Sequence, residues 1–99
     1  MAPTKKYFSP YDVVLTKDFC TDKDITFFPG DLFICGNVHF CANAFRVLGN
    51  LYLWATDDGF PTLEANSAEV HGVFFSNCFD NCRISKITVF KGCDLHSNY

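Results

Sequence analysis

Two short segments of this 99-residue chain, Asp18–Cys20 and His39–Cys41, combine thiol, imidazole and carboxylate groups at a separation of 21 residues. If the central Phe19 and Phe40 point into a core, the neighbours of each point outward, because side chains alternate across a strand. The outward groups could then ligate Zn²⁺ or form a nucleophile arrangement of cysteine, histidine and aspartate. We favour incidental proximity, because the patch depends on strand register and no C-x-x-C spacing accompanies it. The residues in question are Asp18, Cys20, His39 and Cys41.

Other motifs that carry chemistry are missing from the sequence. It contains no Gly-rich phosphate-binding loop, no G-x-S-x-G and no H-E-x-x-H. Cys78 and Cys82 lie close together, but the remaining histidines are too scattered to complete a ligand set with them. We therefore expect a protein that is not an enzyme and that binds no cofactor and no stoichiometric metal.

The composition is that of a folded protein with modest charge. Hydrophobic residues make up 48% of the chain and the formal net charge is −3, so a core can offset the entropy of ordering the chain. Nucleic acid is not an expected partner, because binding it needs clustered Lys and Arg. No stretch is long and apolar enough to span a membrane. No secretion signal is recognisable in residues 1–20, which favours a cytoplasmic protein with six reduced cysteines over extracellular disulfides.

Triplets of the form apolar–x–apolar recur along the chain at nearly constant spacing. The first residues of one series are 19, 19, 22 and 20 positions apart. Turns containing glycine precede four of these triplets, at residues 30–31, 49–50, 71–72 and 91–92. Glycine and asparagine tolerate positive φ, so these dipeptides predict corners. The triplets are Val13-Val14-Leu15, Leu32-Phe33-Ile34, Leu51-Tyr52-Leu53, Val73-Phe74-Phe75 and Cys93-Asp94-Leu95.

Two further series share this period. A second set of triplets has spacings of 20, 18 and 24, and a column of phenylalanines has spacings of 21, 20 and 19. Three series with one period predict a solenoid in which each turn holds three short strands and stacks on the next turn at ~4.8 Å. The second set is Ile25-Thr26-Phe27, Phe45-Arg46-Val47, Leu63-Glu64-Ala65 and Ile87-Thr88-Val89, and the column is Phe19, Phe40, Phe60 and Phe79.

The predicted fold is an all-β, single-domain β-solenoid (β-helix) with about four to five turns of roughly 20 residues. It spans residues 13–99 behind an N-terminal capping segment at residues 1–12. A small β-sandwich or barrel is the alternative, although a sandwich would not require a constant period. Loops are expected to bulge at residues 57–59 and 77–81, and the predicted inward residues are Leu32, Ile34, Leu51, Leu53, Val73 and Phe75.

The turns Gly30-Asp31 and Gly49-Asn50, each followed by Leu-x-Ile or Leu-x-Leu, carry the one resemblance to known proteins. They resemble the repeats of bactofilin-type polymerising β-helices and of other bacterial and phage solenoids. Bactofilin repeats are usually shorter than these. The resemblance therefore implies a solenoid fold, and neither a function nor any functional residue is carried over from it.

Under this register the middle residue of each triplet points outward. In the second set these residues are polar, and Arg46 and Glu64 are expected to form an exposed pair between adjacent turns. In the first series, aromatic rings would stand in adjacent turns as an outward ladder. Such rings together reach the size of patch that marks an interaction site. We expect partner binding at Phe33, Tyr52, Trp54 and Phe74, unless the ladder is covered by N-terminal residues Tyr7, Phe8 and Tyr11.

The function expected from the sequence is that of a non-enzymatic protein-binding module. Its aromatic ladder would face a protein partner or another copy in a homo-oligomer, as in an inhibitor or adaptor encoded by a phage or other mobile element. The second hypothesis is a self-assembling structural solenoid, because open solenoid ends expose unpaired strand edges. The third is a small carbohydrate-binding or metal-dependent protein.

Overall fold

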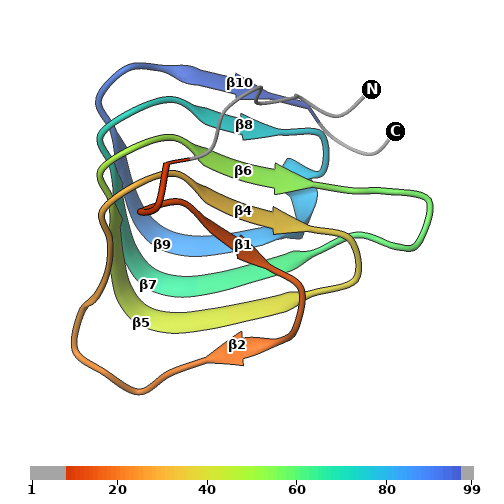
Figure 1. The fold of residues 1–99 in the computed structure, drawn as a ribbon, viewed down its shortest axis with the longest axis horizontal. Helices are drawn as coiled ribbons and strands as arrows, with labels where there is room; N and C mark the ends of the chain where they lie inside the picture. The colour runs from red at the N-terminus through yellow and green to blue at the C-terminus, as the bar shows by residue number, and fades with distance from the viewer. Residues whose placement is uncertain (1–8, 97–99) are drawn as a thin grey trace.

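The chain folds as a parallel β-solenoid of about four turns, in a computed structural model that describes residues 9–96 (Figure 1). No α-helix occurs between these two residues. The sheets are parallel throughout, because each strand pairs with the strand one turn away along the chain. This confirms the fold class predicted from the repeat. We call each turn of the solenoid a rung.

One side of the solenoid is a five-stranded sheet, and its strands run in the same direction (Figure 1). The strands follow the order β1 (Val13–Leu15), β4 (Leu32–Cys35), β6 (Leu51–Trp54), β8 (Phe74–Ser76) and β10 (Cys93–Leu95).

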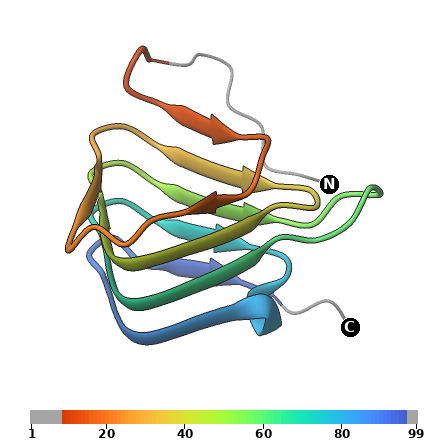
Figure 2. The ribbon, with the colours of Figure 1, turned by 90° about the horizontal axis from the view of Figure 1, so that it is seen from below.

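A second sheet makes the other two sides, because its long strands bend (Figure 2). The first half of β5 (His39–Val47) pairs with β2 (Phe19–Cys20), and its second half pairs with β3 (Thr26–Phe28). Strands β7 (Thr62–Val70) and β9 (Cys82–Val89) continue this stack. At the bend, Asn66 Nδ2 donates to Asn43 Oδ1 at 2.6 Å. Each rung thus has three sides, as the repeat predicts.

The core fills the space between the three sides with side chains from successive rungs. Leu32 lies against Leu51, and Ile34 lies against Leu53, as predicted, and all four are fully buried. Phe40, Phe45 and Val47 contribute from β5. No rung could bury these residues alone, so the stacking of rungs is what stabilises the fold.

A ladder of side-chain oxygens runs along the corner that precedes the first sheet, and we call it the corner ladder. Asp12 Oδ1 accepts a hydrogen bond from the backbone N–H of Asp31, and Asp31 Oδ1 accepts one from the N–H of Asn50. Asn50 Oδ1 accepts the third from the N–H of Val73. All three bonds measure 2.8 Å. Each side chain therefore satisfies a backbone donor in the following rung.

The glycines at this corner are required by close approach to the rung before them. A Cβ placed on Gly49 would overlap the Asp31 carboxylate, and one on Gly72 would overlap the Asn50 side chain. Neither glycine has a positive φ. The sequence placed these corners correctly, but the predicted reason, a left-handed backbone, is wrong at both of them.

The register of the fourth rung differs from the prediction by one residue. Val73 takes the position that Asp31 and Asn50 occupy in earlier rungs, so β8 begins at Phe74. Phe74 pairs with Leu51 and is fully buried, and Phe75 pairs with Tyr52 on the outer face. The predicted inward positions of Val73 and Phe75 are therefore wrong. The pattern misled because Val73 is apolar at a corner position that elsewhere is polar.

The other two series are also corrected in part. Thr26, not Ile25, pairs with Phe45, and Leu63 pairs with Phe40 on a different side of the solenoid. The phenylalanine column holds only for Phe19 and Phe40, which stack at 5.3 Å. In the third and fourth rungs, Leu63 and Cys82 take the expected places of two exposed residues, Phe60 and Phe79.

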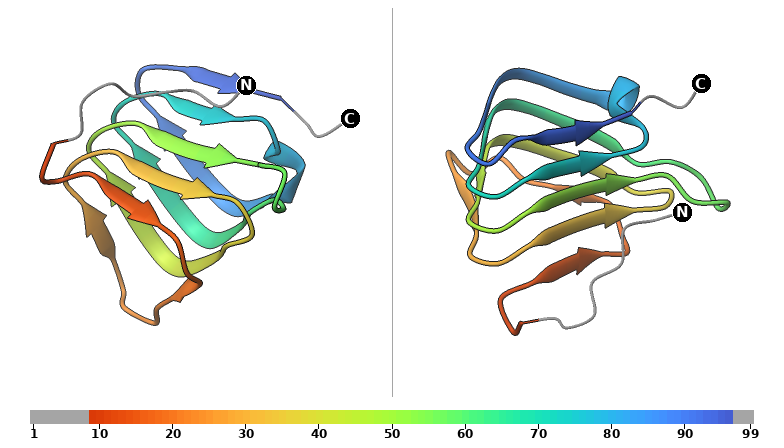
Figure 3. Two further views of the ribbon diagram at one scale, coloured as in Figure 1. Left: turned by 45° about the vertical axis from the view of Figure 1, so that its right-hand side comes forward. Right: turned by 90° about the horizontal axis from the view of Figure 1, so that it is seen from above.

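The predicted bulges have different outcomes. The link between β6 and β7 extends beyond the neighbouring links (Figure 3) and contains an antiparallel bridge between Thr56 and Gly59. In the next rung, residues 77–81 contain the short 3₁₀ helix η1 (Phe79–Asn81). This segment has the same length as residues 35–39 of the second rung, so no extra residues are inserted here. Asn77 bonds both backbone groups of Ala55, which ties this link to the one before it.

Replacement of Gly49 by alanine should destabilise the protein. The added Cβ would collide with Asp31 and with the backbone of Gly30, and overpacking of this kind costs about 1–3 kcal/mol. Urea denaturation gives the change in unfolding free energy. In a double-mutant cycle, Asp31→Ala should remove part of the cost of Gly49→Ala. Strictly additive effects would contradict the proposed contact.

Candidate functional site

The predicted cysteine–histidine patch is present on the outer face of β2 and β5. Phe19 pairs with Phe40 and Cys20 pairs with Cys41, in the register that the spacing of 21 predicts. One ligand atom from each of Cys20, His39 and Cys41 lies within 4.8 Å of the others. Since Phe19 and Phe40 pack inward, these groups face solvent together. We call the three residues the Cys–His cluster.

Two neighbours hold His39 in place. Asp18 Oδ1 accepts a hydrogen bond from the backbone N–H of His39 at 3.0 Å. His39 Nδ1 bonds Thr62 Oγ1 in the following rung. These contacts fix both the backbone and the ring of His39, and they leave Nε2 on the side of the ring away from Thr62.

Glu64 joins the cluster from β7. Its Oε2 lies 3.9 Å from His39 Nε2, and Glu64 pairs with Cys41 in the strand register. Sequence reasoning assigned Glu64 to a different side of the solenoid and so missed it. The available signal was the spacing of 23 residues between Cys41 and Glu64. This spacing indicates a shared column only when the link between β6 and β7 is known to be four residues longer than the link between β4 and β5.

The electrostatics of the cluster do not favour a nucleophile. A hydrogen bond with Cys20 raises the pKa of the Cys41 thiol, and burial and the negative charges of Cys20 and Glu64 raise it further. An activated cysteine needs a lowered pKa. Asp18 bonds the backbone of His39 and not its ring, so the orienting role of a triad carboxylate is unfilled. The arrangement is suited to ligation rather than to nucleophilic attack.

The aromatic ladder exists, with one member exchanged. Phe33 and Tyr52 stack with ring centroids 4.3 Å apart and an interplanar angle of 1°, and Tyr52 and Phe75 stack at 5.0 Å and 10°. Phe75 therefore takes the place predicted for Phe74, which lies in the core. Trp54 is half-buried, and strand alternation places it on the outer side of β6.

The central rings of this ladder are closed to solvent. Phe33 is 7% exposed and Tyr52 is 8% exposed. Of the three N-terminal aromatics predicted as a cover, Tyr11 is exposed, and Tyr7 and Phe8 lie outside the described residues. An open docking patch needs accessible rings, so Phe33 and Tyr52 do not form one in this conformation.

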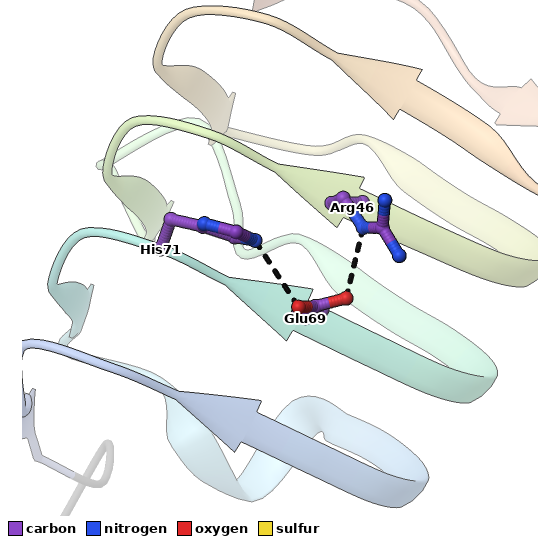
Figure 4. Close-up of polar contacts among 3 residues, drawn as sticks. All are labelled: Arg46, Glu69 and His71. Atoms are coloured by element: carbon purple, nitrogen blue, oxygen red, sulfur yellow. Dashed lines mark hydrogen bonds and ion pairs between the residues drawn. The ribbon is translucent and has the colours of Figure 1, made fainter.

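A polar cluster lies on the third side, at β5 and β7 (Figure 4). Glu69 accepts from Arg46 Nε at 2.8 Å, and its other oxygen lies 3.1 Å from His71 Nε2. The predicted partner of Arg46, Glu64, is thus replaced by Glu69, because the second set of triplets was out of register. All three side chains are substantially exposed, so the ion pairs contribute little to stability. Ser67 and Thr88 line a hollow together with Arg46 and Glu69.

Comparison with known proteins gives no significant match. No family model, no curated protein and no solved structure is similar to this chain. The class that the structure itself defines is a parallel β-solenoid. Residues 9–96 contain no helix that is long and apolar enough to cross a membrane.

Replacement of Tyr52 by aspartate should lower the melting temperature. The change would place a charge among stacked rings that are nearly closed to solvent, at a cost of about 3 kcal/mol or more. Thermal unfolding followed by circular dichroism gives the result. Val14→Asp is the matched control, because Val14 heads the same column and is 51% exposed. Equal effects of the two changes would contradict the burial of the ladder.

The six free thiols should differ widely in reactivity. Burial raises the pKa of Cys82 to about 12, helped by the charge of Cys78, and burial also raises the pKa of Cys35 and Cys78. Because the thiolate is the reactive species, Cys82 should alkylate roughly a hundredfold more slowly than the exposed Cys93 at neutral pH. Mass spectrometry of timed samples measures both rates in one experiment. Comparable rates would contradict the assigned environments.

Proposed function

We propose that this chain is a non-enzymatic protein-binding module that associates end to end with further copies of itself. The proposal depends on one observation: both terminal rungs leave strand edges without partners among residues 9–96, and both expose apolar side chains. An open sheet edge of this kind is a template for pairing with another chain.

At the C-terminal end, β9 pairs only with β7 within the described part of the chain. Ile87 stands in the column of Phe45 and Ala68, which are buried, yet Ile87 is 37% exposed. Phe90, just after β9, is also exposed. The core is therefore open at this rung, where a further rung would close it.

At the N-terminal end, β2 and β3 pair only with β5 as far as residues 9–96 extend. Ile25 and Phe27 flank the start of β3 on the outside, and Phe27 is 52% exposed. This rung is the other place where a rung from a second copy could stack.

The charges of the two ends are complementary. The segment from residue 17 to residue 24 carries three aspartates and two lysines, whereas β9 carries Arg83 and Lys86 and no carboxylate. Lys86 lies beside the corner that Asn43 and Asn66 form in earlier rungs. The link from β2 to β3, with Asp22 and Asp24, turns the same corner in the first rung. Stacking of one copy on the next would bring these groups together.

The direction of the strands supports a head-to-tail arrangement. Since every pairing in both sheets is parallel, the last rung of one copy can continue into the first rung of the next without reversing direction. Such a contact joins two different surfaces, so it repeats and produces open chains of copies. The closed aromatic ladder, by contrast, gives little support for docking at Phe33 and Tyr52.

Replacement of Ile87 by lysine should weaken this association by about tenfold or more, because a charge would enter the apolar contact. Size-exclusion chromatography with light scattering over a range of concentrations measures the mass. Asn66→Lys adds the same charge to an exposed corner of an interior rung and should leave the mass unchanged.

A charge exchange distinguishes end-to-end stacking from general stickiness. Asp24→Lys and Lys86→Asp should each weaken association, and the two changes combined in one chain should restore it. A wild-type protein that stays monomeric at every concentration would overturn the proposal. Strand addition by a different protein along β9 would then become the next candidate.

A further inference from the structure

The Cys–His cluster has the donor set of a zinc site, and we propose that Cys20, His39 and Cys41 bind one Zn²⁺ with Glu64 as the fourth ligand. Two thiolates, one imidazole and one carboxylate are all established zinc donors, and four of them complete a tetrahedron. The sequence led us to expect no metal because it lacks a C-x-x-C spacing. In a solenoid, however, ligands come from adjacent rungs, so their spacing follows the period of the repeat.

The distances allow the ion to be bound with small side-chain rotations. Zinc bonds of about 2.0–2.3 Å place tetrahedral ligand atoms roughly 3.5 Å apart. The three cluster atoms lie within 4.8 Å of one another, and Glu64 Oε2 lies 3.9 Å from His39 Nε2. Cys20 and Glu64 are exposed, so their side chains are free to rotate toward an ion. Glu64 has further to move, because its carboxylate does not lie within 4.8 Å of all three cluster atoms. The backbone already has the required arrangement, because Cys20, Cys41 and Glu64 form one column across three rungs.

The surroundings of His39 favour ligation through Nε2. In the tautomer whose Nδ1–H donates to Thr62 Oγ1, the lone pair of the neutral ring is on Nε2, the nitrogen that lies 3.9 Å from Glu64 Oε2. A hydrogen bond of this kind on the second nitrogen is the usual support for a metal-bound histidine. Asp18, which bonds the backbone of His39, acts as a positioning residue and is not counted as a ligand.

The site is open to solvent and carries negative charge. Cys20 and Cys41 line an open hollow with Thr21 and Asp22, and His39 and Glu64 line a separate hollow of about 220 Å³ that also includes Arg83, so solvent reaches the cluster. Arg83, the next residue in the column after Glu64, is the cation that opposes binding from β9. Two deprotonated thiols and one carboxylate outweigh that single charge.

Zinc bound here would be structural. It would join β2 to β5 and β7, and β2 has only two residues, Phe19 and Cys20. A strand this short contributes few backbone hydrogen bonds of its own, so a bond from Cys20 to the metal would hold the first rung against the rest of the solenoid. The expected consequence is a higher melting temperature of the zinc-loaded protein.

The test uses the full chain, purified with a non-thiol reductant, stripped with a chelator and then supplied with ZnCl₂. Native mass spectrometry should show one zinc per chain, and competition with a chromogenic chelator gives the affinity. Cys20→Ser and Cys41→Ser should each lose about a hundredfold or more in affinity, and Glu64→Gln about tenfold. Cys93→Ser, which removes an exposed thiol outside the cluster, should bind zinc like the wild type.

Two further measurements make the result decisive. Substitution by Co²⁺ should give the thiolate-to-metal charge-transfer band of a cysteine site in the wild type and Cys93→Ser, and a weaker band in Cys20→Ser. Zinc should raise the melting temperature of the wild type and not of Cys20→Ser, whose far-ultraviolet spectrum should match that of the wild type. Reduced wild type that binds no zinc, binding unchanged in both cluster variants, or a Cys20–Cys41 disulfide that persists under reductant would overturn the proposal. Because all four proposed ligands belong to one chain, the outcome is independent of end-to-end association.

Discussion

At the first three junctions between rungs, a side-chain oxygen at the corner occupies the space that a Cβ would otherwise take. Asp31 bonds the backbone of Asn50, and it fits there only because the adjacent Gly49 has no side chain. The hydrogen bond and the glycine are therefore one constraint. It fixes which residue begins each strand of the first sheet, and hence which side chains enter the core. The packing of Leu32 on Leu51, the stacking of Phe33 on Tyr52 and the pairing of Cys20 with Cys41 all follow from that alignment.

The repeat period made the fold predictable, because regular spacing in several series is difficult to produce in any other architecture. The inward leucines of β4 and β6 and the Cys20–Cys41 pairing could be read from single spacings, since the rungs that carry them have regular corners. The position of Phe74 could not be read, because Val73 is apolar at a corner and imitates the first residue of a strand. Glu64 was missed for a related reason: four extra residues before β7 move it into the Cys41 column, and an irregular link leaves no periodic signal.

The closure of the aromatic ladder could not be predicted from the strand pattern. Alternation correctly places Phe33 and Tyr52 on the outer face, but the face of a strand and its exposure are separate properties. Exposure depends on what lies over the sheet. Several apolar groups that remain accessible, among them Phe27, Ile87 and Phe90, lie at the two ends of the stack, whereas Leu48 and Phe60 are exposed on interior rungs. Among residues 9–96, unpaired strand edges therefore occur at the two ends of the solenoid, whereas the strands of interior rungs are paired on both sides.

The corner also sets the unit in which this chain can change length. The corner positions from Asp12 to Gly92 are 19, 19, 23 and 19 residues apart, and the extra residues of the long interval lie between β6 and β7, away from the corner. Insertions in that link alter the outline of the molecule without disturbing the alignment. Insertion of one residue between a glycine and the residue after it would turn the side chains of the following strand to the wrong face. Growth by gene duplication would therefore have to proceed in whole rungs, from one glycine to the next. Only a complete rung includes both a corner side chain with an oxygen and a glycine that leaves space for the corner oxygen of the preceding rung.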